Sequence, residues 1–251
     1  MAIVLRLLVC IALVPAGLSA QTSRSTSAAS YVGRGNEWLK KGEINKAIED
    51  YNTAILFSPQ SAFIYYNRAH AHQEAGDVDA AIQDYSKAIQ FDPKFAYAYN
   101  NRGNLLAKKG DFASAMSDYD QAIKWRKHFS RAYFNRATVR LEKSDTDGAI
   151  ADYTLAIGSN RRYAMAYNNR GVARQAKGDL DGAILDFSKA IKLAPQDAGA
   201  YANRGLVRLL QGKTSEAEQD FARCTLLKPD MRETIESGIA RFKQGSNAAH
   251  H

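Results

Sequence analysis

A three-residue signature built on arginine recurs every 34 residues along this chain, and no insertion or deletion interrupts the interval. The copies are Gly33-Arg34-Gly35, Asn67-Arg68-Ala69, Asn101-Arg102-Gly103, Asn135-Arg136-Ala137, Asn169-Arg170-Gly171 and Asn203-Arg204-Gly205. Self-similarity at a fixed interval is typical of a stacked array, in which each unit buries its apolar face against its neighbours. We therefore expect a repeat protein that works by presenting a surface.

The hydrophobic spacing within each copy predicts two helices. In the second copy, Tyr65, Ala69 and His72 fall at positions i, i+4 and i+7, which lie on one face of a helix. Gly76 interrupts that helix, and a second apolar stripe follows before Pro93. Each unit should therefore be a helical hairpin. The expected units are 28–61, 62–95, 96–129, 130–163, 164–197 and 198–231.

The residues of these hairpins resemble the tetratricopeptide repeat, whose units read W-x2-L-G-x2-Y, then A-x3-F, then P. In the first unit the matching residues are Tyr31, Arg34-Gly35, Trp38, Ala47, Tyr51 and Pro59. The resemblance implies an all-α fold, a right-handed superhelical solenoid of helix-turn-helix hairpins, and a function in binding other proteins.

This chain departs from the family pattern in three ways. Arginine replaces the usual leucine before the small residue in every copy. Lys127 and Arg161 replace the terminal proline in the third and fourth units, and Ser144 replaces the turn glycine in the fourth. Because the interval of 34 residues survives these changes, we expect only local effects.

The N-terminal residues 1–20 have the pattern of a secretory signal peptide. Arg6 precedes a short apolar stretch, and Leu18-Ser19-Ala20 offers a small-residue cleavage site. We expect cleavage after Ala20, a flexible segment over 21–27, and a secreted or periplasmic protein without stable membrane insertion. An uncleaved membrane anchor is the alternative.

The C-terminal residues predict a helix that caps the array. Asp230 and Glu233 have the spacing of a capping box, and Ile235 and Ile239 begin an apolar stripe. We expect this capping helix over 232–244, because a terminal repeat needs a polar-backed cover. A flexible tail should follow over 245–251.

Composition limits the classes of function. The chain is 45% hydrophobic with a net charge of +8, and its basic residues are spread over many positions. We therefore expect no nucleic-acid partner. Cys224 occupies a position that holds alanine in the other units, which predicts a small buried residue.

The asparagine of the signature is the best candidate for a binding residue. At about 100° per residue it points roughly 160° away from the core-facing tyrosine two positions earlier. In similar repeats such asparagines line the concave groove and bind the backbone of an extended peptide, for which a carboxamide has the right donors and acceptor. The alternative is that asparagine is a tolerated, solvated residue. The positions are Asn67, Asn101, Asn135, Asn169 and Asn203.

Several apolar and aromatic residues share the asparagine face. They are Phe63, Tyr97, Met165, Val172, Leu206 and Leu210. An exposed apolar patch usually marks a partner-binding surface. Alternatively, the C-terminal helix folds over the part of this patch in the fifth and sixth units.

Each arginine of the signature is followed by an aspartate sixteen residues later. The pairs are Arg34 and Asp50, Arg68 and Asp84, Arg102 and Asp118, Arg136 and Asp152, Arg170 and Asp186, and Arg204 and Asp220. In a helical hairpin these positions can face each other, which favours structural ion pairs that set helix registry. The less favoured interpretation is that the arginines bind an acidic ligand.

We find no pattern typical of an enzyme, a metal site or a cofactor site. Lys124-Trp125-Arg126-Lys127-His128, with Arg131, Arg161 and Arg162, concentrates positive charge that a partner could use, although a solvated loop is the simpler interpretation. We expect an adaptor that binds a protein or peptide. A scaffold with weak self-association, or an accessory subunit of an envelope enzyme, remains an alternative.

Overall fold

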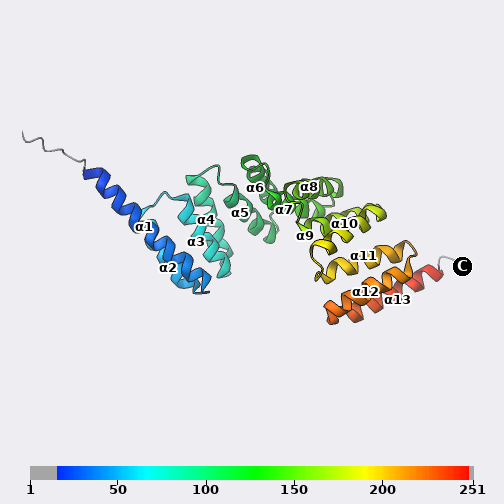
Figure 1. The fold of residues 1–251 in the computed structure, drawn as a ribbon. Helices are drawn as coiled ribbons and strands as arrows, with labels where there is room; N and C mark the ends of the chain where they lie inside the picture. Colours follow the sequence, from blue (N-terminus) through cyan, green and yellow to red (C-terminus); the bar gives the residue numbers. More distant parts are fainter. Residues whose placement is uncertain (1–15, 249–251) are drawn as a thin grey trace, which may run out of the picture. The chain divides into compact units, whose positions relative to one another are not determined.

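The computed structural model describes residues 16–248, with side chains from Ala28 to Ala240. This part of the chain contains thirteen α-helices, one short 3-10 helix and no strand (Figure 1). The helices are α1 (Ala16–Lys40), α2 (Ile44–Phe57), α3 (Ala62–Glu74), α4 (Val78–Phe91), α5 (Ala96–Lys108), α6 (Phe112–Trp125), α7 (Ser130–Glu142), α8 (Thr146–Ser159), α9 (Ala164–Ala176), α10 (Leu180–Leu193), α11 (Ala198–Leu210), α12 (Thr214–Leu227), η1 (Pro229–Met231) and α13 (Arg232–Ala248).

Two compact units divide the chain between Ala98 and Tyr99, near the start of α5. Unit 1 contains α1 to α4, and unit 2 contains α6 to α13 with most of α5. Within each unit, successive helices pack as adjacent antiparallel pairs. The predicted all-α fold of helical hairpins is confirmed.

A left-handed residue turns the chain between the two helices of each hairpin. Five of these turns use glycine, for example Gly76 with φ of 82° and Gly178 with φ of 85°. Ser144 takes the same place in the turn between α7 and α8, with φ of 63°. A non-glycine residue in this conformation costs about 1–2 kcal/mol, so Ser144 makes this turn less stable than a turn with glycine.

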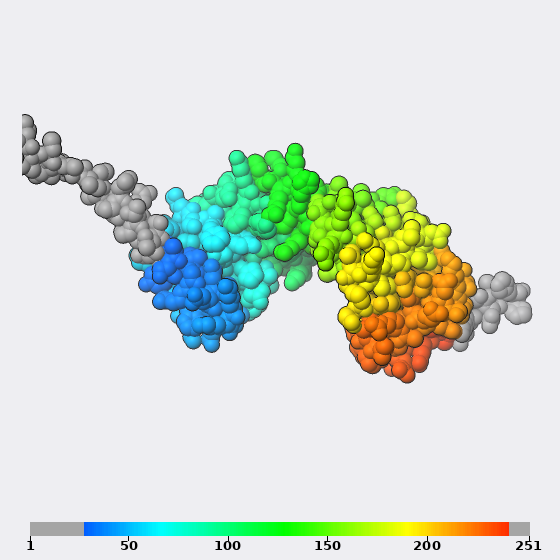
Figure 2. All heavy atoms as spheres, in the orientation of Figure 1, coloured from blue at the N-terminus to red at the C-terminus, as the bar shows by residue number. Residues whose placement is uncertain are grey.

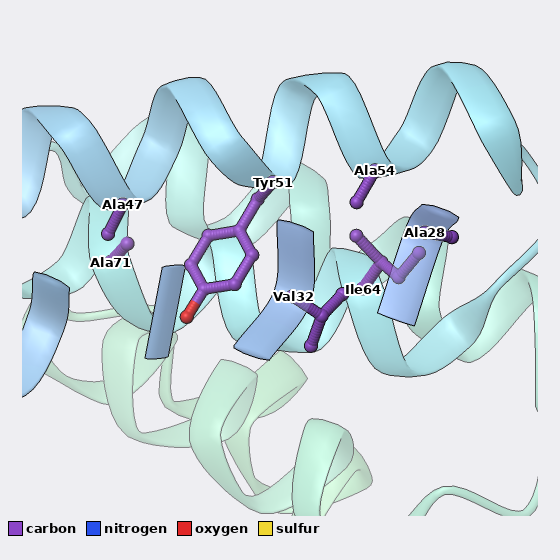
Figure 3. Packing of buried hydrophobic residues seen from close by; sticks show 7 residues of the cluster. All are labelled: Ala28, Val32, Ala47, Tyr51, Ala54, Ile64 and Ala71. Carbon is purple, nitrogen blue, oxygen red and sulfur yellow. The ribbon is translucent and has the colours of Figure 1, made fainter. Parts of the chain in front are cut away.

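In each hairpin, an aromatic ring from the second helix is buried between the helices. In unit 1 the fully buried ring of Tyr51 lies among Ala47, Ala71 and Val32 (Figure 3). The glycine of the signature lets the two helices approach, because a Cβ added at Gly35 would lie 2.8 Å from Cε1 of Tyr51. Small residues in the signature therefore follow from the position of the ring.

The N-terminal helix differs from the expectation for its segment. Helix α1 begins at Ala16, so residues 21–27 belong to a helix, where a flexible segment was expected from the sequence. They are small or polar residues without proline or glycine, so no residue there breaks a helix that continues into the first hairpin. Residues 1–15, which carry most of the predicted signal peptide, lie outside the described part of the chain. No helix between Ala16 and Ala248 combines the length and apolarity needed to cross a membrane.

At the C-terminus, α13 extends to Ala248, so residues 245–248 of the expected tail are helical. Ile235 and Ile239 pack against Leu209 and Phe221. Figure 2 shows α13, in red-orange, directly against the orange surface of α12. The helix therefore covers α12, the second helix of the last hairpin.

Cys224 is fully buried in α12, with its Sγ 3.8 Å from Sδ of Met231. Burial raises the pKa of its thiol.

Candidate functional site

The asparagines of the signature lie on the first helix of each hairpin from α3 onward. In unit 2 they are bonded to one another through a second asparagine. Nδ2 of Asn135 donates to Oδ1 of Asn100 at 3.0 Å, and Nδ2 of Asn100 donates to Oδ1 of Asn101 at 3.0 Å. The network therefore joins α5 to α7 across neighbouring hairpins.

The same network recurs one pair of hairpins later. Nδ2 of Asn203 donates to Oδ1 of Asn168 at 3.0 Å, and Nδ2 of Asn168 donates to Oδ1 of Asn169 at 3.2 Å. These bonds join α9 to α11. The asparagines of unit 2 are thus fixed in orientation by their neighbours, and are not simply solvated side chains.

Sequence reasoning missed Asn100 and Asn168, which complete these networks. The signal was present as the doublets Asn100-Asn101 and Asn168-Asn169, which occur in the third and fifth hairpins. The second and fourth hairpins have Tyr66 and Phe134 at this position, and the sixth has Ala202. The ring centroid of Phe134 lies 5.0 Å from that of Tyr163. The asparagine doublet therefore occurs in the third and fifth hairpins and not in the others.

Unit 1 contains one asparagine of the signature, Asn67. Its Nδ2 is buried and has no hydrogen-bond partner among the described residues. Phe63 and Tyr97 of this unit are exposed.

In unit 2 the predicted apolar residues do not all lie on the open surface. Met165 is 56% exposed, Leu206 43% and Leu210 45%. Val172 instead packs against the core formed by Phe187 and other residues, so it does not belong to the exposed patch. The alternative in which the C-terminal helix covers the patch is wrong, because α13 packs on α12 and leaves the two leucines exposed.

The arginines and aspartates of the six hairpins are bonded to each other. In each pair, Nε and Nη2 of the arginine donate to the two carboxylate oxygens at 2.5–2.9 Å. All six aspartates are buried. Such bidentate pairs are strong and geometrically specific. For example, the bond to Asp152 raises the pKa of Arg136.

A second arginine, which sequence reasoning missed, joins three of these pairs. Nη1 of Arg140 lies 2.9 Å from Oδ2 of Asp152, and Arg174 and Arg208 contact Asp186 and Asp220 in the same way. The signal was an arginine four residues after that of the signature, one helical turn further on. With their nitrogens on buried carboxylates, these arginines are poorly placed to bind an acidic ligand.

Tyrosine hydroxyls link the two helices of several hairpins. The hydroxyl of Tyr51 donates to Oδ1 of Asn36 at 2.6 Å, and that of Tyr119 donates to Asn104 at 2.9 Å. Burial, reinforced by the charge of Asp50, raises the pKa of Tyr51 to about 12. The hydroxyls are therefore neutral donors at physiological pH.

Chemically, the arrangement offers hydrogen bonds and apolar contacts. The described residues contain no cluster of histidine, cysteine, aspartate or glutamate that could hold a metal ion. A surface of preset amides beside exposed apolar side chains is suited to binding a polypeptide.

Comparison with known proteins identifies the repeat. Models described as tetratricopeptide repeat match residues 96–129, 164–197 and 198–231, and a model described as TPR repeat matches residues 35–76 and 74–110. None of the curated proteins compared with the sequence matches it.

Solved structures share the fold at low sequence identity. PilF of Pseudomonas aeruginosa is 17% identical, and the match covers 86% of this chain and 99% of PilF with a TM-score of 0.76. PilW, described as a type IV pilus biogenesis factor, is 17% identical over 83% of this chain and 97% of its own, with a TM-score of 0.73. YrrB, described as a TPR protein with an unusual peptide-binding site, is 21% identical over 75% of this chain and 97% of its own, with a TM-score of 0.63.

Proposed function

This chain belongs to the tetratricopeptide repeat family, and from that premise we propose that it is an exported, non-catalytic adaptor. It binds an extended segment of a partner protein on the asparagine face of unit 2. We define this face by Asn101, Asn135, Asn169 and Asn203 together with Met165, Leu206 and Leu210. The observation that carries the proposal is the amide network beside apolar side chains that no other helix of the unit covers.

The network prepares the amides for a peptide backbone. Asn135 and Asn203 each use one N–H on a neighbouring asparagine, and a carboxamide has a second N–H and an oxygen with two lone pairs. Because the side chains are already oriented, a ligand orders fewer groups when it binds. Asn100 and Asn168 provide this preparation from the third and fifth hairpins.

Magnitudes indicate that the apolar residues supply most of the affinity. A hydrogen bond contributes about 0.5–1.5 kcal/mol net, so four amides give roughly 2–6 kcal/mol. Ordering a flexible segment costs about 2–5 kcal/mol or more, which can cancel that gain. Burial of one large apolar side chain contributes about 1.5–3 kcal/mol. The partner segment should therefore present apolar residues to Met165, Leu206 and Leu210.

Two observations favour a location in the cell envelope. The N-terminal residues have the pattern of a signal peptide. PilW, one of the structural neighbours, is a type IV pilus biogenesis factor.

Site-specific crosslinking in the native cell tests the proposal. A photoreactive benzoylphenylalanine is placed at Met165 or Leu206 on the asparagine face, and at Leu185 or Leu226 as controls. The controls are large apolar residues at least as exposed, but they lie on the second helices of their hairpins, α10 and α12. We expect both face positions to trap the same protein and both control positions to miss it.

A matched pair of substitutions separates binding from folding. Leu206→Ser should weaken capture of that partner about tenfold or more, by loss of one buried apolar contact, whereas Leu185→Ser should not. Circular dichroism checks that both variants stay helical. Equal capture by the wild type and Leu206→Ser, or crosslinks from Leu185 alone, would show that the asparagine face is not the binding surface.

A further inference from the structure

Two turns of unit 2 have cations where the other turns between hairpins have proline. Lys127 lies between α6 and α7, and Arg161 lies between α8 and α9. The prolines at the equivalent positions are Pro59, Pro93, Pro195 and Pro229.

The residue before each of these two cations has nearly the same backbone conformation as a residue before one of the prolines. Arg126, before Lys127, has φ of −136° and ψ of 87°, and Asn160, before Arg161, has −145° and 95°. Ala194, which precedes a proline, has nearly the same values of −135° and 78°. In this fold, a residue before proline and a residue before either cation thus adopt nearly the same backbone conformation. The amides of Lys127 and Arg161 donate no hydrogen bond within the described chain, so proline would remove none.

Turn geometry therefore does not explain the two cations. Proline at a compatible position stabilises a protein by restricting its unfolded chain. The two successive turns lack this stabilisation by proline, and each has a positively charged residue instead.

These turns form one exposed cluster, which we call the basic edge. It consists of Lys124, Arg126, Lys127, Arg131, Arg161 and Arg162, all exposed. Packing of Phe134 on Tyr163 holds the two turns near each other. Arg131 lies close enough to Tyr163 for its charge to oppose the rise in the pKa of that hydroxyl caused by burial.

The basic edge has no acidic residue to balance it in the nearby sequence. No aspartate or glutamate occurs between Asp120 and Glu142, or between Asp152 and Asp179. No salt bridge to another described residue is formed by five members of the edge, namely Lys124, Lys127, Arg131, Arg161 and Arg162.

At the opposite end of the same helices, each turn within a hairpin has an aspartate that caps the next helix. These are Asp111, Asp145 and Asp179. These turns also have Lys109, Lys143 and Lys177, so that end carries both signs of charge, whereas the basic edge carries cations alone.

Trp125 adds an apolar element to this edge. It is 39% exposed, and Nζ of Lys124 lies 5.1 Å from the centroid of its ring. A partly exposed indole flanked by lysine and arginine is typical of residues at a membrane interface, where one side of the ring is wet and the other is in contact with lipid.

We propose that the basic edge docks unit 2 on a membrane surface that contains anionic phospholipid. The cations lie on long side chains at the tips of two turns, and a field of mobile phosphate groups can meet them without fixed geometry. The exposed indole favours lipid over an acidic protein segment, which would need a complementary shape. The basic edge shares no residue with the asparagine face as defined above, and the proposal does not depend on the function proposed for that face.

Vesicle binding by the full-length chain tests the proposal. The vesicles contain phosphatidylcholine alone or mixed with phosphatidylglycerol. Any apolar contribution from the N-terminal residues appears with both kinds, so the preference for anionic vesicles isolates the electrostatic part. We expect that preference, and we expect it to decline as salt is added.

The double variant Lys127→Pro with Arg161→Pro removes two cations while keeping the turns. Because each cation near an anionic surface changes affinity about fivefold, the variant should bind anionic vesicles roughly 30-fold more weakly. Its thermal midpoint should equal or exceed that of the wild type. The control, Lys143→Gln with Lys189→Gln, lowers net charge equally at exposed lysines outside the edge and should keep most of the affinity.

Three outcomes would overturn the proposal. The wild type could bind both kinds of vesicle equally, or the control could lose as much affinity as the proline variant. Alternatively, soluble polyglutamate could bind in a manner that depends on the basic edge while anionic vesicles do not, in which case the partner is an acidic protein segment. Leu206→Ser should leave vesicle binding unchanged, which distinguishes this surface from the asparagine face.

Discussion

The hairpins α1/α2 and α9/α10 each have a buried aspartate at the equivalent position, and they stabilise it in different ways. In α1/α2, Asp50 is paired with Arg34, whose side chain is 56% exposed. In α9/α10, Asp186 accepts from both Arg170 and Arg174, at 2.7–2.9 Å, and both arginines are mostly buried. One hairpin thus has a single, partly solvated cation, and the other has two desolvated ones.

The rings beside these carboxylates differ as well. Tyr51 bonds through its hydroxyl to Asn36, whereas Phe187 has no hydroxyl at the equivalent position. The first hairpin therefore links its helices partly through a neutral hydrogen bond, and the later one through charge. Hairpins with the same backbone can depend on different interactions.

Of the changes that test this difference between the hairpins, removal of the aspartate should lower the free energy of unfolding the most. Asp186→Ala leaves two buried guanidinium groups without their carboxylate, and we expect a loss of about 3–5 kcal/mol in the free energy of unfolding. Asp50→Ala should cost less, about 1–3 kcal/mol, because Arg34 can turn toward water. Urea unfolding measures both, and an equal or reversed order would show that the second arginine does not matter.

Removal of the second arginine alone should have an intermediate effect. Arg174→Leu introduces the residue type that Leu106 provides at the equivalent position of α5. It deletes a charged hydrogen bond to Asp186, so we expect a loss of about 1.5–3 kcal/mol by urea unfolding. Lys189→Ala, at an exposed residue of the same hairpin, is the control. No loss in Arg174→Leu would mean that Arg170 satisfies the carboxylate by itself.

Alkaline pH should have the smallest effect on stability. It acts on the first hairpin, through ionisation of the Tyr51 hydroxyl. The pKa of Tyr51 is about 12 in the fold, against about 10 in an unfolded chain. Because the unfolded state loses its proton first, Tyr51 contributes stability that is present below pH 10 and is lost as pH rises toward 12.

The wild type should therefore lose stability between pH 8 and pH 11, and Tyr51→Phe should lose less. Urea midpoints at the two pH values measure this, and Tyr119 and Tyr153 contribute the same background to both proteins. The prediction fails if the two proteins lose the same amount.

Much of the fold followed from the repeat. The interval of 34 residues and the positions of Gly76 and Pro93 were enough to predict the helical hairpins, because helix breakers and apolar spacing act locally. The ends were predicted less well, since residues 21–27 contain no breaker and continue the first helix. Composition alone did not distinguish a flexible segment from the start of a helix.

The candidate site could be predicted only in part. The exposure of Met165 and Leu206 followed from helical periodicity. The bonds of Asn135 to Asn100 and of Arg140 to Asp152 did not, because they depend on how two helices approach each other. Packing of Val172 against the core depends on the same approach.

Burial of Cys224 has a consequence for the redox chemistry of the protein. An exposed free thiol in an oxidising compartment invites disulfides between molecules. Cys224 is enclosed in α12 and its thiol has a raised pKa, so little reactive thiolate is present near neutral pH. To be oxidised it would first have to be uncovered by local opening of the last hairpin. A chain with a single cysteine in the described region can thus remain in its reduced form without a partner thiol.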